Sequence, residues 1–386
     1  MRVVFATFPV PSHYFPMVPL GWAMRAAGHE VRVTCPPSLT ATVTGSGLPA
    51  VTIPEVDLAS FWRGFATPPG GGPPSPAERA QRAIAMFTMV AQASAGPVTE
   101  FARDWRAELI VYEPRAYAAV LAANALGLPL VRHLSGVDYT FSRTEAERPA
   151  LDELWQRCDA PGADPLGAVT VDPCPPSLQI PAPVVRKAIR YLPYNGPAVA
   201  PDWLLAPPAR PRVCISAGSA LPGRKDMVAA ARQAVGALAG LDAEVVVAAG
   251  GNPDLLEPIP AGFRVLERMP LHLLLPTCAA IVHHGGAGTT LTAAACGVPQ
   301  LLLPDGGDRF LHAGQLSGAG AGIAISQVDA TPAAILDGAR TLLADSSYRH
   351  AARRLQQEMA RQATPVQIVD ALAALAAPAY SRNGSR

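Results

Sequence analysis

The chain of 386 residues lacks long apolar runs and lacks an excess of charge of either sign. No stretch approaches the roughly 20 consecutive apolar residues that a membrane-spanning helix needs. With 31 basic and 30 acidic residues the net charge is +1, so no overall field attracts the chain to a nucleic acid or an anionic membrane. The sequence therefore predicts no nucleic-acid partner and no membrane partner, and it indicates a small neutral or weakly charged ligand.

Lysine and paired cysteines are also scarce. Only two of the 31 basic residues are lysine, which we attribute to coding composition. The six cysteines are widely scattered and none has the spacing of a metal-binding pair, so the pattern favours buried free thiols. The N-terminal MRVVFATF begins at once with an apolar strand pattern and lacks the tripartite layout of a signal peptide. We therefore expect a cytoplasmic protein.

Short apolar segments of strand length alternate with helix-like segments along the chain. Between the first two strand candidates, MVPLGWAMRAA has a helical pattern that ends at Gly28 and completes a β-α-β unit. Such alternation predicts the α/β class with parallel sheets. The strand candidates are residues 2–8, 30–35, 108–113 and 129–135 in the first half, and 212–218, 243–250, 263–268, 279–285, 300–305 and 321–326 in the second.

A Pro-rich, aperiodic segment at residues 191–212 separates two blocks of this alternation. The chain length also suggests two domains, at about 150 residues each. We predict two doubly wound Rossmann-like domains that face each other across a cleft, at residues 1–198 and 212–370, joined by a linker at 199–211. We expect residues 371–386 to form a C-terminal helix or tail that packs back on the first domain.

Three polar features follow strands of the two predicted sheets. His13 follows the first strand, Glu113 ends a later strand of the same half, and HHGGAGTT, which begins at His283, ends a strand of the second half. Ligands of doubly wound sheets bind outside the carboxyl ends of the strands. We therefore expect these features to converge on one cleft.

The glycine-rich stretch HHGGAGTT suits an anion. Glycines allow close approach of the backbone, and the N-terminus of the following helix presents unpaired amides. His284 can donate a hydrogen bond to a phosphate oxygen, whereas His283 should point to the other face of the strand and have a structural role. The alternative is that Gly285, Gly286 and Gly288 only form a tight turn between strand and helix.

The segment HHGGAGTTLTAAACGVPQLLLPDGGDRFLHAGQL closely resembles the nucleotide-sugar signature of the family 1 glycosyltransferases, in particular the bacterial enzymes that attach deoxysugars to antibiotics and other polyketides. VDPCPPSLQ, RYLPYNGP, RVCISAGS and RVLERMPLHLLLPTCAAIV look like the same subgroup, and SHYFPMVPLGWAMRAAGHEV looks like the start of its acceptor lobe. The resemblance implies the GT-B fold, with the acceptor in the first domain and the nucleotide sugar in the second, and an inverting mechanism without metal or cofactor. It also implies a dTDP-deoxysugar as donor substrate and a hydrophobic polyketide-type aglycone, aromatic or macrolide, as acceptor.

The resemblance assigns donor-binding residues in the second domain. His284 and the amides near it would hold the diphosphate, and Gly218 and Ser219 would approach the phosphates or the nucleoside. Arg268 stands where plant relatives often have an aromatic residue that stacks on the base, and its guanidinium plane can stack too. Thr292 stands where many uridine-diphosphate-sugar enzymes have a ribose-binding glutamate, which fits a 2-deoxyribose donor. The implied donor-binding residues are Gly218, Ser219, Arg268, Met269, His284, Gly286, Gly288, Thr289, Asp308 and Arg309.

The resemblance places the catalytic base at His13. An acceptor hydroxyl is a poor nucleophile until its proton is removed, and a neutral imidazole with a pKa of about 6.5 suits that task. Glu113 falls where relatives often have an aspartate that orients the base, and Asp138 is a second catalytic carboxylate if the bond formed is to carbon. The alternatives are a loop histidine that caps a helix and a strand-end carboxylate that faces solvent or a helix N-terminus.

Aromatic residues of the first domain suggest an apolar acceptor pocket. We expect Phe61, Trp62, Phe87 and Tyr139 to line it. The alternative is that such residues are part of the core.

Other activities stay open from the sequence alone. The same scaffold would serve a C-glycosyltransferase, a nucleotide-sugar 2-epimerase or a non-catalytic helper of a partner transferase. SHYFPMVPL argues against the epimerase, and the presence of both His13 and His284 argues against lost catalysis. The pattern identifies neither the aglycone nor the deoxysugar, and it is compatible with a homodimer and with an auxiliary protein.

Overall fold

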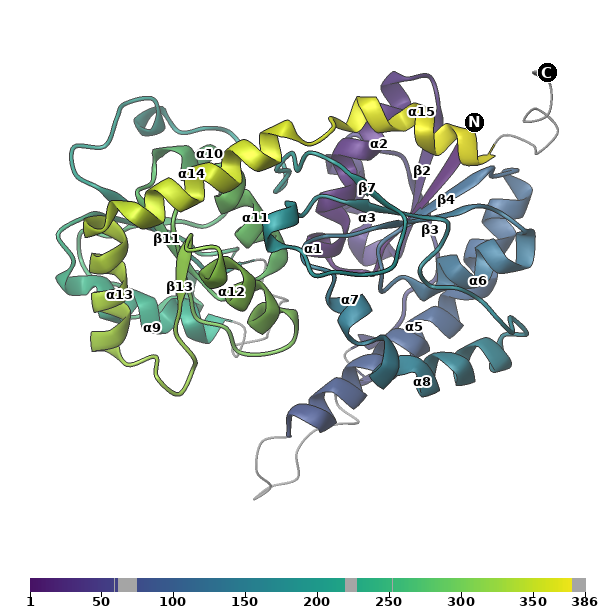
Figure 1. Ribbon diagram of the computed structural model, residues 1–386, viewed down its shortest axis with the longest axis horizontal. Coiled ribbons are helices and arrows are strands. Elements are labelled where there is room, and N and C mark those ends of the chain that lie inside the picture. Colours follow the sequence, from purple (N-terminus) through teal and green to yellow (C-terminus); the bar gives the residue numbers. More distant parts are fainter. Residues whose placement is uncertain (59, 62–74, 219–227, 252, 377–386) are drawn as a thin grey trace.

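The structure is a computed structural model that describes residues 1–58, 60, 61, 75–218, 228–251 and 253–376. It contains two parallel β-sheets, one of seven strands and one of six, each with helices packed on both faces (Figure 1). We call the part of the chain around the seven-stranded sheet the first lobe and the part around the six-stranded sheet the second lobe. The prediction of an α/β fold with two doubly wound lobes is therefore confirmed.

The first sheet has the strand order β3-β2-β1-β4-β5-β6-β7, and every neighbouring pair is parallel. The apolar pattern does not predict β3, β6 or β7, and β3 and β7 are the two edge strands of this sheet. The strands are β1 Arg2–Ala6, β2 Glu30–Cys35, β3 Ala50–Thr52, β4 Leu109–Tyr112, β5 Leu130–His133, β6 Val169–Asp172 and β7 Arg186–Ala188. The helices are α1 Pro11–Tyr14, α2 Val18–Ala26, α3 Pro37–Gly45, α5 Pro76–Asp104, α6 Tyr117–Leu126, α7 Tyr139–Ser142 and α8 Thr144–Arg157.

The second sheet has the order β10-β9-β8-β11-β12-β13 and is also parallel throughout. Its six strands match the six segments predicted for the second half. The strands are β8 Arg212–Ser216, β9 Glu244–Ala248, β10 Arg264–Leu266, β11 Ala280–His283, β12 Gln300–Leu302 and β13 Gly322–Ala324. The helices are α9 Ala229–Ala237, α10 Leu271–Leu274, α11 Ala287–Ala295, α12 Asp308–Gly318, α13 Pro332–Ala344, α14 Ser346–Arg361 and α15 Pro365–Ala376.

The continuous apolar runs of the strands follow from burial on both faces. In β1, Val3 and Phe5 pack into a core with α2, α3 and α15, whereas Val4 and Ala6 pack into a second core with α5, α6 and α8. All four side chains are almost fully buried. A parallel sheet covered by helices on both sides has no solvent-facing row, so its strands do not alternate between apolar and polar residues.

Both sheets reverse their strand order at one point. In the first lobe the reversal lies between β1 and β4, and in the second lobe between β8 and β11. A crevice forms at the carboxyl ends of such a pair because the two following connections leave toward opposite faces of the sheet. The segments that follow these four strands are therefore the places where a ligand is expected.

The lobes are joined by an apolar interlobe core and by the C-terminal helices. Tyr191 and Leu178 of the first lobe pack with Leu291 and Leu316 of the second. Helix α14 covers the second lobe, and α15 returns to pack against α2 (Figure 1). The side chains of α15 that enter the first-lobe core are Ile368, Val369 and Leu372.

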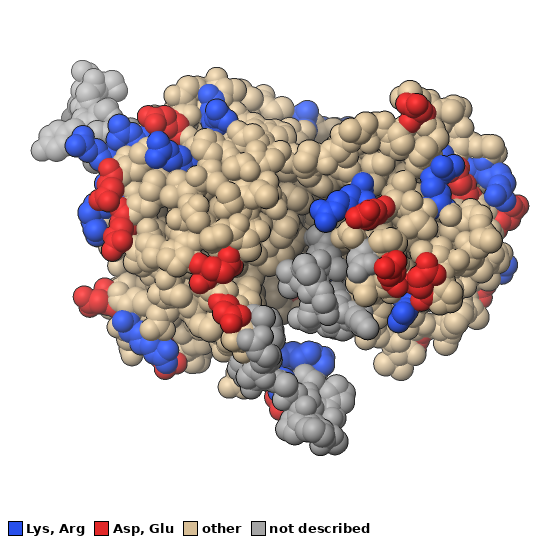
Figure 2. Space-filling view, turned by 180° about the vertical axis from the view of Figure 1, so that it is seen from behind, with Lys and Arg blue, Asp and Glu red and all other residues tan. Residues whose placement is uncertain are grey.

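The surface is mixed in charge. Figure 2 shows basic and acidic side chains interspersed over both lobes, and a hollow between the lobes. In the described ranges, none of the helices has the length and apolar character that crossing a bilayer requires.

Candidate functional site

His13 and Glu113 meet at the strand-order reversal of the first lobe. His13 lies in α1, the first helix after β1, and Glu113 directly follows β4. Nδ1 of His13 is 2.9 Å from Oε1 of Glu113. The other carboxylate oxygen accepts a hydrogen bond from the backbone N–H of Arg115 at 3.1 Å. The carboxylate is thus held by the backbone on one side and contacts the imidazole on the other.

The electrostatic environment raises the pKa of His13. Burial lowers this pKa, but the nearby Glu113 carboxylate more than offsets burial, and Asp308 raises the pKa further. Glu113 is almost fully buried, whereas 31% of the His13 side chain is exposed. Asp308 begins α12 of the second lobe.

An apolar cluster lies beside His13. The rings of Phe8 and His13 are 5.4 Å apart, and Phe87 packs edge-on against Phe8 at 5.0 Å. Phe61 packs against the same cluster. The structure therefore brings two of the predicted acceptor residues, Phe61 and Phe87, to the cluster beside His13, although both are only partly buried and also serve the local packing. Trp62 lies outside the described residues.

Arg115 is a part of this region that sequence reasoning missed. Its guanidinium is buried, forms an ion pair with Glu147 and donates a hydrogen bond to the Tyr117 hydroxyl. It lies over the ring of Phe87 at 4.7 Å and near the ring of Tyr139 at 5.9 Å. Tyr139 is half-buried and is one of the predicted acceptor residues. Through Arg115 it lies in the same region as Phe87. The only signal in the sequence is the position of Arg115 two residues after Glu113.

His284 sits in a space that two glycines leave open. A β-carbon on Gly218 would lie 2.5 Å from its Cε1, and one on Gly286 would lie 2.5 Å from its Nε2. Gly218 follows β8, and His284 and Gly286 follow β11, so this contact lies at the strand-order reversal of the second lobe. Nδ1 of His284 is buried without a hydrogen-bond partner. The glycines therefore serve more than a tight turn, because they make room for this imidazole.

His284 is neutral. Burial, together with the guanidinium of Arg309, holds its pKa well below 6.5. A neutral imidazole offers one N–H donor and one acceptor. Beside it, α11 begins with Gly286 as N-cap, and the first amides of the helix, including those of Gly288 and Thr289, have no acceptor inside the helix. This arrangement can hold an anion such as a diphosphate.

His283 has the structural role that its strand position predicts. Its Nδ1 accepts a hydrogen bond from the backbone N–H of Gly285 at 3.1 Å, so its Nε2 donates to Oε1 of Gln300 at 2.9 Å. Burial lowers the pKa of His283 to about 4. The side chain of Gln300 in turn donates to the carbonyl of Thr290 in α11. His283 thereby fixes the turn that positions His284.

The other predicted donor residues are distributed around this turn. Asp308 is 44% exposed at the start of α12, and Arg309 forms an ion pair with Asp305. Arg268 follows β10 and is highly exposed, with its guanidinium near Gly251. Met269 is partly buried and packs against the apolar core of the second lobe. Ser219 lies outside the described residues.

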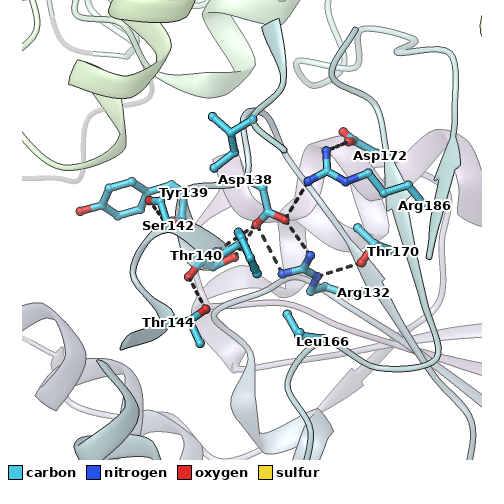
Figure 3. Close-up of polar contacts among 12 residues, drawn as sticks. Arg132, Asp138, Tyr139, Thr140, Ser142, Thr144, Leu166, Thr170, Asp172 and Arg186 are labelled. Atoms are coloured by element: carbon cyan, nitrogen blue, oxygen red, sulfur yellow. Dashed lines mark hydrogen bonds and ion pairs between the residues drawn. The ribbon is translucent and has the colours of Figure 1, made fainter. Parts of the chain in front are cut away.

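Asp138 is not placed as a free carboxylate of the acceptor cleft. It is almost fully buried, and Arg132 donates to both of its oxygens, at 2.7 and 3.4 Å (Figure 3). It also caps α7 by accepting from the backbone N–H of Phe141 and from the hydroxyl of Thr140. Arg186 lies 3.6 Å away. A carboxylate with these partners holds the ends of β5 and β7 together, and its catalytic role stays a prediction.

Thr292 also makes its contacts inside the protein. Its hydroxyl donates to the carbonyl of Gly288 at 2.6 Å and lies 3.2 Å from the hydroxyl of Tyr191. Asn195 donates to it at 3.5 Å and accepts from the backbone N–H of His272. Residues of the Pro-rich segment 191–212 therefore contact α11, the helix that follows the glycine-rich turn. Tyr191 and Asn195 carry no sequence signal for this contact.

Among the residues that the structure describes, no group of three histidine, cysteine, aspartate or glutamate side chains is arranged to hold a metal ion. A histidine–carboxylate pair lies at the strand-order reversal of the first lobe, and a glycine-rich turn with a buried histidine lies at that of the second. Two doubly wound lobes of this kind have the architecture of a GT-B glycosyltransferase.

Comparison with known proteins identifies the family. The model of the "Erythromycin biosynthesis protein CIII-like, N-terminal domain" matches residues 22–218, and the model of the corresponding C-terminal domain matches residues 232–375. The chain is 40% identical to the L-demethylnoviosyl transferase of Streptomyces niveus, over 97% of this chain and 98% of that protein. It is 35% identical to the 10-deoxymethynolide desosaminyltransferase of Streptomyces venezuelae, over 98% and 97% of the two chains.

A solved structure shows the same architecture. The spinosyn rhamnosyltransferase SpnG, in complex with thymidine diphosphate, superposes with a TM-score of 0.83 at 31% identity, over 97% of this chain and all of that one. SpnG has also been solved with spinosyn aglycone. The fold is that of the GT-B glycosyltransferases. The chain belongs to the erythromycin biosynthesis protein CIII-like family and is a glycosyltransferase.

Proposed function

We propose that the protein is an inverting glycosyltransferase that transfers a deoxysugar from a dTDP-sugar to a polyketide-type acceptor in antibiotic biosynthesis, with His13 as the general base. The observation that carries this proposal is the 2.9 Å contact between His13 and Glu113 at the strand-order reversal of the first lobe. The names of the relatives, an L-demethylnoviosyl transferase and a desosaminyltransferase, support a deoxysugar as the group transferred.

His13 is arranged to accept a proton. Oε1 of Glu113 lies 2.9 Å from Nδ1, and its negative charge favours a proton on that nitrogen, which leaves the lone pair of Nε2 for the acceptor hydroxyl. The hydroxyl oxygen forms a bond to the anomeric carbon as its proton moves to Nε2. The bond from that carbon to the diphosphate oxygen breaks on the opposite face, which inverts the configuration.

The second lobe is arranged to accept the leaving group. The diphosphate gains negative charge as it departs, and the amides at the start of α11 together with an N–H of His284 stabilise it. SpnG, which binds thymidine diphosphate, supports a thymidine nucleotide as the carrier. The apolar cluster of Phe8, Phe61 and Phe87 beside His13 supports a hydrophobic aglycone.

The test is a transfer assay with purified protein, dTDP-deoxysugars and a panel of aromatic and macrolide aglycones, followed by mass spectrometry. The expected product is an aglycone that gains one deoxysugar, with formation lost in His13→Ala and retained in His350→Ala, a variant of an exposed histidine on α14. A donor that isomerises without any aglycone would contradict the proposal and indicate an epimerase. Transfer that persists in His13→Ala would remove His13 as the base.

A further inference from the structure

His312 is a buried histidine of α12 that the proposed mechanism does not use. Only 3% of the residue is exposed. Its Nδ1 lies 3.1 Å from the carbonyl oxygen of Gly285 and 3.6 Å from Oδ2 of Asp308. Both neighbours accept hydrogen bonds, so Nδ1 carries the proton of the neutral ring. The Gly285 carbonyl is the nearer of the two acceptors and is within hydrogen-bond distance, so the N–H donates to it.

Two histidines therefore hold the same glycine. His283 binds the N–H of Gly285 from the strand side, and His312 binds its C=O from α12. Gly285 has a φ of +87°, a conformation that glycine adopts without the steric cost of a β-carbon. His284 and Gly286, which flank it, are the residues that face the predicted anion site. The orientation of that site is thus fixed by hydrogen bonds at both ends of one residue.

The opposite side of His312 rests against the first lobe. Its Nε2 is buried without a hydrogen-bond partner. A β-carbon on Gly136 would lie 2.7 Å from Nε2 and 2.9 Å from the β-carbon of Ala287 in the first turn of α11. Only a glycine fits at this distance. The backbone of Gly136 therefore contacts both the histidine that holds the turn and the helix that follows the turn.

The segment that contains Gly136 is itself rigidly held. The side chain of Gln179 donates to the Gly136 carbonyl at 3.4 Å and to both oxygens of Asp172, at 2.9 and 3.1 Å. The same side chain accepts from the backbone N–H of Asp138 at 2.9 Å. Asp138 is the centre of the buried network with Arg132 (Figure 3). This network thus supports the first-lobe surface against which His312 is seated.

We propose that His312 is a positioning residue of the donor site, which fixes the Gly285 turn through its Nδ1–H while Gly136 of the first lobe seats its ring. The affinity for the donor diphosphate then depends on a contact between the lobes, and not on the second lobe alone. This inference rests on the proposed function, because it takes the His284 turn as the diphosphate site.

The test is the binding of thymidine diphosphate, measured by isothermal titration calorimetry on the full-length protein. His312→Leu removes the N–H that binds the Gly285 carbonyl and keeps much of the side-chain volume. We expect the Kd of this variant for thymidine diphosphate to rise about fivefold to tenfold, as for one lost hydrogen bond. His312→Asn places an amide nitrogen where Nδ1 was and is expected to recover most of the affinity. Gly136→Ala is expected to weaken binding, whereas Gly314→Ala, on α12 with open space at its β-carbon, is the control and is expected to leave Kd unchanged.

Steady-state kinetics separate positioning from general damage. His312→Leu is expected to raise KM for the dTDP-sugar while KM for the aglycone stays as in the wild type. Equal binding by the wild type, His312→Leu and Gly136→Ala would overturn the inference. Equal losses in His312→Leu and His312→Asn would also overturn it, because packing alone would then explain the effect. A wild-type protein that does not bind thymidine diphosphate would overturn the proposed donor and this inference together.

Discussion

Nδ1 of His13 lies 2.9 Å from Oε1 of Glu113, and the two residues follow neighbouring strands, β1 and β4, at the point where the strand order of the first sheet reverses. The opposite oxygen of Glu113 is held by a backbone N–H. The topology of the sheet therefore positions the carboxylate, and the carboxylate positions the imidazole. The charge on Glu113 and its place in the fold both contribute to the basicity of His13.

Removal of that charge should change the pH dependence of transfer. A general base acts in its neutral form, so kcat/KM rises with pH through the pKa of His13, which the structure places above 6.5 because Glu113 outweighs burial. In Glu113→Gln burial acts without this carboxylate, so the pKa falls. We expect the acidic limb of the kcat/KM profile to move to lower pH and the plateau to drop roughly 100-fold, because the ring loses its orientation and basicity.

The control for this prediction is Glu153→Gln, which removes a carboxylate from an exposed pair with Arg157 on α8. This variant should keep the acidic limb and the plateau of the kcat/KM profile as they are in the wild type. If the limb in Glu113→Gln stayed where it is in the wild type, Glu113 would not set the pKa of the group that titrates.

The space around His284 gives a second prediction. Gly286 has an extended backbone, φ −63° and ψ 143°, which any residue adopts, so Gly286→Ala changes only the space. The new β-carbon would lie 2.5 Å from Nε2 of His284 and would displace the ring. We expect binding of thymidine diphosphate to weaken about tenfold or more, comparable to the loss of the imidazole hydrogen bond in His284→Ala.

A double-mutant cycle checks the cause. If the alanine acts by displacing His284, the double variant should bind about as weakly as His284→Ala alone, because the second change has no ring left to displace. Gly236→Ala, on α9 with open space at its β-carbon, is the control and should bind like the wild type. Losses that add fully in the double variant would show that Gly286 acts independently of His284.

The sequence predicts the parts of this molecule that depend on local patterns. Apolar runs identify the long strands, and residues such as His13 and Glu113 can be placed together because both follow strands of one parallel sheet. Asp138 shows where this reasoning ends. Its partners Arg132 and Arg186 come from β5 and β7, and their meeting depends on the register of three strands, two of which the apolar pattern does not predict. The contact of Gly136 with His312 depends in the same way on how two lobes pack.

The burial of Asp138 predicts a loss of stability on its removal. Arg132 is almost completely buried, and in Asp138→Asn its guanidinium would lose its charged partner. Breaking a buried pair from one side costs about 3–5 kcal/mol. We therefore expect a large fall in the free energy of unfolding, measured by urea denaturation, whereas Asp242→Asn, in an exposed pair with Arg210, should change it little. Normal stability with abolished transfer would instead support the catalytic role that the sequence suggested.

The buried histidines predict how stability depends on pH. Burial lowers the pKa of His133 to about 4, and its Nε2 has no hydrogen-bond partner. The unfolded chain has the ordinary value of about 6.5, so between these values the unfolded state binds more protons and stability is lost as pH falls. For one such histidine the loss between about pH 7.5 and about pH 5 amounts to about 2 kcal/mol. His13 acts in the opposite direction, because its folded pKa is raised and its contribution is lost as pH rises.

His133→Asn isolates this effect. The asparagine can keep the hydrogen bond that Nδ1 makes with the carbonyl of Leu134, at 2.8 Å in the wild type, but it does not titrate. Urea denaturation near pH 7.5 and near pH 5 should therefore show a fall in the free energy of unfolding that is smaller than in the wild type by about 2 kcal/mol. His350→Asn, on the exposed face of α14, should keep the full wild-type fall. An identical fall in His133→Asn and the wild type would mean that His133 takes up no more protons when the chain unfolds, which contradicts a lowered pKa in the folded state.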